Sequence, residues 1–301
     1  MRFVSHPKWG LGAVAAEEPG ALVVVFASAG RKRLATSFKA LSDVADHDVP
    51  VDHPLRTAER WPEIERDAVR AVATGNLPSR FDGFMKEFLE RFPGGLRSPK
   101  CDAEERDYKV KAGEYVRKEL SPQVLDDLLA RGDHAEVVAR ARRCLARTNL
   151  AFPNEQMKFG DLPESAYPAV AQRVARLVRA GEETPSALDD LAAALVPHGA
   201  AKWPIVSLLP FLMHPTEWPF VKPKAIQRAA TATGIDVEYH SRPNARTYRL
   251  VRELYQQVAK ELRVRGPEWE PRDFIDVQTF LWVASGMKRE MDEARDAKAD
   301  G

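Results

Sequence analysis

The chain has few cysteines, no long apolar run and almost no net charge. Cys101 and Cys144 are the only cysteines in 301 residues, too few for a disulfide framework, which favours a reducing compartment. No apolar run approaches the ~18–20 residues that a membrane span needs, and the opening residues MRFVSHPKWG contain no apolar signal region. We therefore expect a cytoplasmic protein with no membrane partner.

Several motifs that carry catalysis are also absent. The chain has no G-x-x-x-x-G-K-[ST] loop for nucleotide phosphates and no G-x-S-x-G nucleophile turn. Its seven histidines show no H-x-x-x-H spacing and no pairing with cysteine. We therefore predict no metal and no cofactor, and no catalytic residue can be named.

The length suits about two domains, each able to bury a core. The balance of 45 Lys+Arg against 44 Asp+Glu argues against a uniformly basic protein that coats nucleic acid. However, residues 1–45 carry 6 Lys+Arg against 3 Asp+Glu, and residues 221–266 carry 10 against 4. These basic segments either form a surface for a polyanion or pair with the acidic segments 46–220 and 267–301.

The first 45 residues alternate between short β-strand patterns and turns. The run ALVVVF at 21–26 follows the turn dipeptide Pro19-Gly20, and RKRLA at 31–35 can form the returning strand. Several short strands with tight turns in so few residues predict a bent sheet that closes as a small β-barrel.

Aromatic residues, glycines and a closing Ser-Phe-x-x-Leu motif follow one another in this segment in an order that resembles a known module. Its motifs are HPKWGLGAV at 6–14, LVVVF at 22–26, KRL at 32–34 and SFKAL at 37–41. They resemble the Tudor-like (SH3-type barrel) module at the C-terminus of UvrD-type DNA helicases and, more broadly, the polymerase-interacting barrel of CarD-type transcription regulators. The resemblance implies a non-catalytic module that binds a protein partner, often RNA polymerase, or lies beside nucleic acid. It does not extend to a helicase motor, because no P-loop is present.

One aromatic residue and four cations are the predicted partner-binding residues of this module: Lys8, Trp9, Arg31, Lys32 and Arg33. Trp9 has two interpretations, because an aromatic side chain in a small barrel is either an exposed anchor or a core residue. The four cations are expected to be solvated and to attract phosphate or an acidic patch together.

The rest of the chain follows helical spacing. Residues 46–56, which are rich in Asp and Pro, are predicted to form a linker. Apolar periodicity from 57 to 285 predicts a larger, mainly α-helical domain, in which a sub-boundary could fall near residue 150. Residues 286–301 are expected to be a charged, frayed tail. The predicted fold class is thus α+β, and its predicted helices include about 165–180, 185–196, 223–233, 244–264 and 272–284.

The segment DFIDVQTFLWV at 273–283 resembles part of a helical domain of uncharacterised bacterial proteins, and this resemblance implies no activity. If Asp276 or Gln278 is buried within it, we expect the side chain to satisfy backbone donors.

The predicted helix 244–264 combines an apolar stripe with arginines mostly on the opposite face. The arginine fork suits phosphate, whereas solvated helix faces more often use Lys with Glu. Charge pairing with the acidic tail is the alternative. The predicted phosphate-contacting residues are Lys222, Lys224, Arg242, Arg246, Arg249 and Arg252.

These patterns favour a non-catalytic bacterial interaction protein. Its barrel would bind RNA polymerase or another nucleoprotein component, or DNA or RNA, and the basic helix would assist. Two alternatives stay open. The first is a structural adaptor in which Trp9 is buried and the basic helix packs on the acidic tail. The second is an enzyme of unknown class with a site in region 198–240, which contains His198, His214, His240, Glu217, Asp236 and Glu238.

Overall fold

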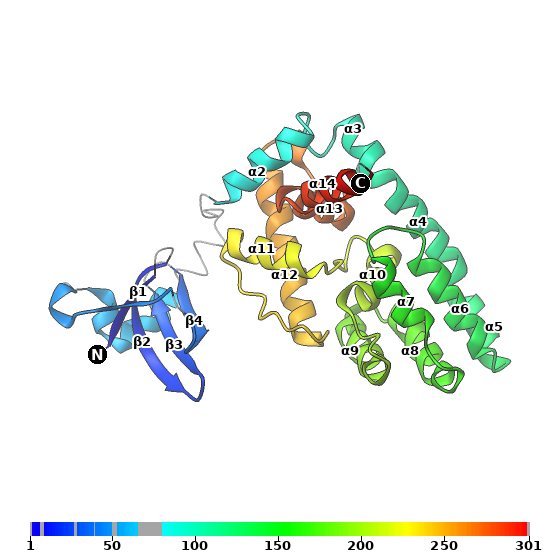
Figure 1. Cartoon of the computed structure of the whole chain (residues 1–301), viewed down its shortest axis with the longest axis horizontal. Helices are drawn as coiled ribbons and strands as arrows, with labels where there is room; N and C mark the ends of the chain where they lie inside the picture. The colour runs from blue at the N-terminus through cyan, green and yellow to red at the C-terminus, as the bar shows by residue number, and fades with distance from the viewer. Residues whose placement is uncertain are drawn as a thin grey trace. The chain divides into compact units, whose positions relative to one another are not determined.

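The protein consists of a strand-bearing unit followed by a helical one. The computed structural model describes residues 2–6, 9–26, 29–38, 40–49, 53–65 and 80–299. The chain divides into two compact units, Met1–Leu77 and Pro78–Gly301 (Figure 1). All strands of the described residues lie in the first unit, and the second is built from helices. The mixed α+β class predicted from the sequence is therefore confirmed.

The N-terminal unit is a five-stranded antiparallel sheet in the order β4-β3-β2-β1-β5. Gly20 occupies the tight turn between β2 and β3 with a φ of +77°, a conformation that glycine adopts without strain. Strands β4 and β5 are the edges of this sheet. The strands are β1 (Phe3–His6), β2 (Gly10–Glu18), β3 (Ala21–Phe26), β4 (Gly30–Ala35) and β5 (Ser42–Val44).

Strand β3 supplies both faces of the sheet with core residues. Val25 packs with Phe3 on one face, whereas Val24 and Phe26 pack on the other, because successive side chains of a strand point to opposite faces. A Cβ at Gly12 would lie 2.7 Å from the Phe26 ring and from Val24. The close packing of Phe26 on β2 therefore requires glycine at position 12.

The segment predicted to be a linker, residues 46–56, contributes to the first of these cores. Val49 and Leu55 are buried in the same cluster as Phe3, and the Trp61 indole donates a hydrogen bond to the Leu55 carbonyl at 3.0 Å. An apolar sheet face must be covered by another element. Residues after β5 provide that cover, although their Asp- and Pro-rich composition indicates a linker.

The C-terminal unit has one helix group around α13 and a second group of packed helices. Helix α13 contacts α2, α11, α12 and α14, whereas α8 packs on α6 and α9, and α10 packs on α4. The sub-boundary considered near residue 150 falls inside this unit. The helices of the described residues, apart from short 3₁₀ turns, are α2 (Arg80–Arg91), α3 (Pro99–Cys101), the π-helical turn η4 (Asp102–Arg106), α4 (Asp107–Glu119), α5 (Pro122–Ala130), α6 (His134–Leu145), α7 (Pro153–Gly160), α8 (Tyr167–Arg179), α9 (Thr184–Leu195), α10 (Trp203–Met213), α11 (Pro223–Thr233), α12 (Ala245–Arg263), α13 (Phe274–Ala284) and α14 (Met287–Ala299).

Helix α13 is buried along its whole length. Its sequence FIDVQTFLWVA is apolar on nearly every side, which is typical of a helix surrounded by others. Asp273 caps its first turn by accepting from the backbone N–H of Ile275. The segment predicted as a tail forms α14, and Glu290 of this helix pairs with Arg228 of α11 at 2.6 Å.

The two buried cysteines of the helical unit make its stability depend on pH. Both thiols are buried, and burial raises the pKa of Cys101 and of Cys144 from 9.0 to about 12. A folded-state pKa above the unfolded value contributes stability below pH 9.0 that is lost as the pH rises toward 12.

We expect the unfolding free energy to fall above pH 9.0, and to fall less steeply in Cys144→Ala than in the wild type. Each thiol contributes a slope of at most about 1.4 kcal/mol per pH unit. Urea unfolding at about pH 8 and about pH 10.5 measures the two slopes. Equal slopes for the variant and the wild type would contradict the assignment.

Candidate functional site

An aromatic cluster covers one part of the N-terminal unit. The Trp9 ring stacks on His6 with a centroid distance of 4.0 Å and lies nearly parallel to Phe38 at 6.2 Å. Its inner side contacts Phe26, which is fully buried. Trp9 is half-buried, and Phe38 is 37% exposed. We call His6, Trp9 and Phe38 the aromatic surface, because the stack extends from the core to solvent.

Two of the four predicted cations of this unit pair with carboxylates. Arg31 pairs with Glu65 at 2.9 Å, and Arg33 pairs with Glu18 at 2.8 Å. Lys32 also has an interaction within the structure. Lys8 lies outside the described residues. The positive charge of β4 is therefore partly neutralised within its own unit.

Three of the six predicted phosphate-contacting residues are engaged inside the helical unit. Lys222 is buried, donates to Glu155 at 3.0 Å and lies 3.3 Å from the centroid of the Phe152 ring. Arg246 forms a two-pronged pair with Glu238. These contacts reduce the charge that the two side chains present to a polyanion.

Arg252 is the third engaged residue. Its guanidinium lies over the Trp218 ring at 4.5 Å and 3.6 Å from Glu182. By contrast, Lys224, Arg242 and Arg249 are exposed and form no ion pair within the described part of the chain. The cationic surface that remains is smaller than the sequence predicts.

Two of the residues considered for an enzyme site at 198–240 have partners within the helical unit. The His214 ring hydrogen-bonds the Val178 carbonyl at 3.1 Å, and Glu238 is occupied by Arg246. Among the described residues, no group of three His, Cys, Asp or Glu side chains is arranged to hold a metal ion. Among all the residues that the structure describes, no helix is both long enough and apolar enough to cross a bilayer.

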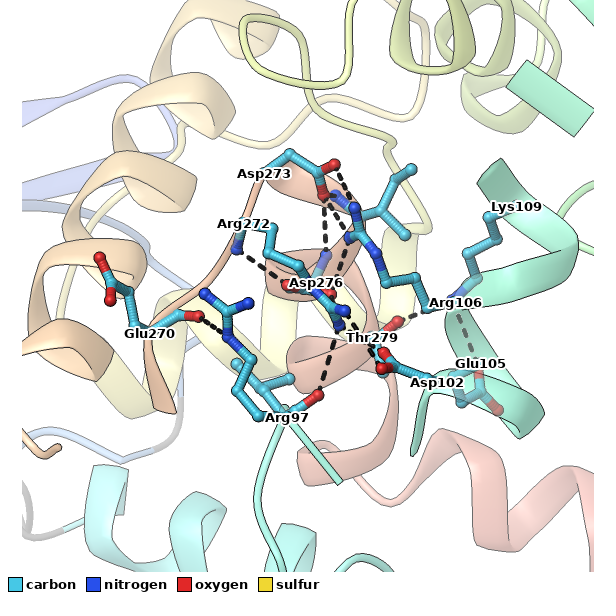
Figure 2. A network of polar contacts seen from close by, with 12 residues as sticks. Arg97, Asp102, Glu105, Arg106, Lys109, Glu270, Arg272, Asp273, Asp276 and Thr279 are labelled. Carbon is cyan, nitrogen blue, oxygen red and sulfur yellow. Dashed lines mark hydrogen bonds and ion pairs between the residues drawn. The ribbon is translucent and has the colours of Figure 1, made fainter. Parts of the chain in front are cut away.

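A polar network joins the start of α4 to the start of α13 (Figure 2). Arg106 of η4 donates to both carboxylate oxygens of Asp273 at 2.7 Å and to Asp276 at 2.8 Å. Arg272 donates to Asp276 at 2.8 Å through both its backbone N–H and its Nε. Burial lowers the pKa of Arg272, but hydrogen bonds to Asp102 and Asp276 outweigh it and leave that pKa raised. Both guanidinium groups therefore stay charged.

A second branch of the network lies deeper. Lys109 is fully buried and donates to Glu105 at 3.2 Å and to Thr279 of α13 at 2.9 Å (Figure 2). Burial lowers the pKa of Lys109, whereas Glu105 opposes this shift. Lys288 of α14 approaches the other Glu105 oxygen at 3.4 Å. Glu105 thus links three helical segments.

No protein-family model, curated protein or solved structure matches the chain. Its function must therefore be inferred from its own residues.

The sequence indicates part of this polar network. The expectation that a buried Asp276 satisfies a backbone donor is confirmed, because it accepts from the Arg272 N–H. The same expectation is wrong for Gln278, whose buried Oε1 has no hydrogen-bond partner among the described residues. Arg106, Lys109 and Glu105 were not predicted as site residues, because their partners on α13 and α14 lie about 170 positions or more along the chain.

Proposed function

We propose that the protein is a non-catalytic interaction protein whose N-terminal unit binds a protein partner through the aromatic surface. The proposal includes that this unit is a Tudor-like barrel and that the partner is bacterial RNA polymerase, as the sequence resemblance implies. The observation that carries the proposal is the half-buried Trp9, which clusters with His6 and the exposed Phe38. Aromatic side chains held in place by their neighbours are typical anchors of protein interfaces.

A protein partner fits this surface better than a nucleic acid does. Arg31 and Arg33 are paired with carboxylates of the same unit. Nucleic-acid affinity depends on cations that can release counterions from phosphates. Lys224, Arg242 and Arg249, the predicted phosphate-contacting residues that are exposed and form no ion pair with the described residues, would assist electrostatically.

Phe38→Ala should weaken binding of the full chain to purified bacterial RNA polymerase about 10-fold or more, because anchors of an interface contribute more than about 1.4 kcal/mol. Phe38 is partly exposed, so its truncation leaves the sheet core intact. Trp9→Ala should have the same direction of effect. Surface plasmon resonance with the immobilised polymerase measures the affinity.

Met157→Ala is the matched control, because Met157 is an exposed apolar residue of the other unit. Its affinity for the polymerase should equal that of the wild type. The proposal is wrong if the wild type does not bind the polymerase. It is also wrong if the chain instead binds a short DNA duplex with an affinity that Arg249→Glu abolishes and Phe38→Ala leaves unchanged.

A further inference from the structure

Helix α14 is attached to the rest of the helical unit mainly by ion pairs. Asp, Glu, Lys or Arg occupies eight of its thirteen positions, MKREMDEARDAKA. Four of these ions pair with residues of three neighbouring elements. The pairs are Arg289–Glu87 and Asp292–Arg91 with α2, Lys288–Glu105 with η4, and Glu290–Arg228 with α11.

The side of α14 that faces the unit is only half apolar. Met287 is buried and Met291 is partly buried. Lys288 and Asp292, which lie beside them, are also turned inward and are only 15% and 17% exposed. An ion that is partly buried loses hydration, and this loss offsets much of the attraction to its partner. The docking of α14 is therefore weak compared with the apolar packing of α13.

The end of α13 is capped without any contribution from α14. The Ser285 N–H donates to the Leu281 carbonyl at 3.1 Å, and the Gly286 N–H donates to the Val283 carbonyl at 2.9 Å. Gly286 has a φ of +75°, a conformation common for glycine just after a helix. These bonds satisfy carbonyls at the end of α13. The chain beyond Gly286 can therefore unwind while α13 stays intact.

Salt weakens the ion pairs at the outer side of α14. The Arg289 side chain is 58% exposed, and the side chains of Arg228 and Glu290 are 41% and 44% exposed. The distance over which exposed charges interact falls to about 3 Å at 1 M salt. The apolar contacts of α13 are not screened in this way. Ionic strength should therefore affect α14 more than α13.

Helix α14 covers a polar group that its opening would hydrate. Lys288 and Met291 line a small pocket together with Tyr108, Gln278 and Trp282. The Gln278 Oε1 is buried and has no hydrogen-bond partner among the described residues. Solvent water can donate to this oxygen once α14 moves away, which lowers the free energy that opening costs. A helix as short as α14 is marginally stable alone in water, so it unwinds when it detaches.

We propose that α14 is a strap that opens by local unfolding when the ionic strength rises, while α13 and the helices packed on it stay folded. Opening breaks the pairs of α14 with α2, η4 and α11 and uncovers Tyr108, Gln278 and Trp282. The strap thus controls access to this face of α13. The proposal is independent of the aromatic surface and of the protein partner of the N-terminal unit.

Hydrogen exchange of the full chain, followed by mass spectrometry of its peptides, tests the strap. Raising NaCl from about 50 mM to about 1 M should speed exchange of the backbone amides at 288–293 about tenfold. The amides of α12 and α13 should change less than about twofold, because apolar packing protects them. Equal acceleration of α13 and α14, or exchange of α14 that does not depend on salt, would overturn the proposal.

A charge reversal tests one of the pairs at low salt. Arg289→Glu places a carboxylate beside Glu87 and should speed exchange of α14 about fivefold. Adding Glu87→Lys restores an opposite charge and should return most of the protection. Arg131→Glu is the matched control, because Arg131 is exposed and forms no ion pair within the described part of the chain. Unchanged exchange in Arg289→Glu, or a double variant that exchanges as fast as the single one, would refute the strap.

Discussion

Replacing Asp276 with alanine should lower the unfolding free energy of the helical unit by about 3–5 kcal/mol, the typical loss when a buried ion pair is broken. Asp276 is 2% exposed and accepts from Arg106, from the Arg272 side chain and from the Arg272 backbone. Its removal leaves two guanidinium groups short of a counter-charge in a partly buried site. Urea unfolding followed by far-UV circular dichroism measures the loss.

Asp276→Asn distinguishes the contribution of the negative charge from that of the hydrogen bonds, because it removes the charge of the side chain. Asparagine keeps one acceptor oxygen, so its loss of stability should be smaller than that of alanine. Asp126→Ala is the matched surface control, because Asp126 pairs with Arg179 at 2.8 Å but is mostly exposed. Exposed pairs contribute about 0–1 kcal/mol. If Asp276→Ala is no more destabilising than Asp126→Ala, the network does not hold α13 against α4.

The amino-acid pattern predicts the helices and strands better than it predicts which charged residues pair with each other. Apolar spacing places the helix predicted at 244–264, observed as α12 (Ala245–Arg263), and the helix predicted at 272–284, observed as α13. Both predictions are confirmed. They could be made from the sequence because helical periodicity depends on residues that are close together in the chain. The turn Pro19-Gly20 likewise separates two strands as predicted.

The pairing of charges is set by the tertiary fold and not by local spacing. Residues 221–266 are strongly basic in sequence, yet Arg246 faces Glu238 and Arg252 faces Glu182. The acidic tail, the partner expected from the sequence, does pair with this basic segment, through Glu290 and Arg228 of α11. A charge count over a segment therefore overstates the free cationic surface.

Lys109→Met should be the other strongly destabilising substitution, with an expected loss of about 3 kcal/mol, because it breaks a buried ion pair. The fully buried ammonium bridges Glu105 and Thr279. In the variant, Glu105 retains only Lys288, at the longer distance of 3.4 Å. Adding Glu105→Gln to Lys109→Met removes both charges of the pair, so the double variant should be more stable than the sum of the single losses predicts. Additive losses would contradict a coupled pair, and Lys224→Met should change little.

The pH dependence of the unfolding free energy shows whether burial or the ion pair with Glu105 has the larger effect on the pKa of Lys109. Burial lowers the pKa of Lys109 in the folded protein below its ordinary value of 10.5, and Glu105 only partly opposes this shift. Between the folded-state pKa and 10.5 the unfolded chain binds more protons, so the contribution of Lys109 to stability rises with pH. The unfolding free energy of the wild type minus that of Lys109→Met should therefore increase toward alkaline pH. Both proteins carry Cys101→Ala in this comparison, because the Cys101 thiol interacts with Lys109, and the titration of Cys144 then cancels in the difference. A difference that falls with pH would mean that ion pairing with Glu105 outweighs burial.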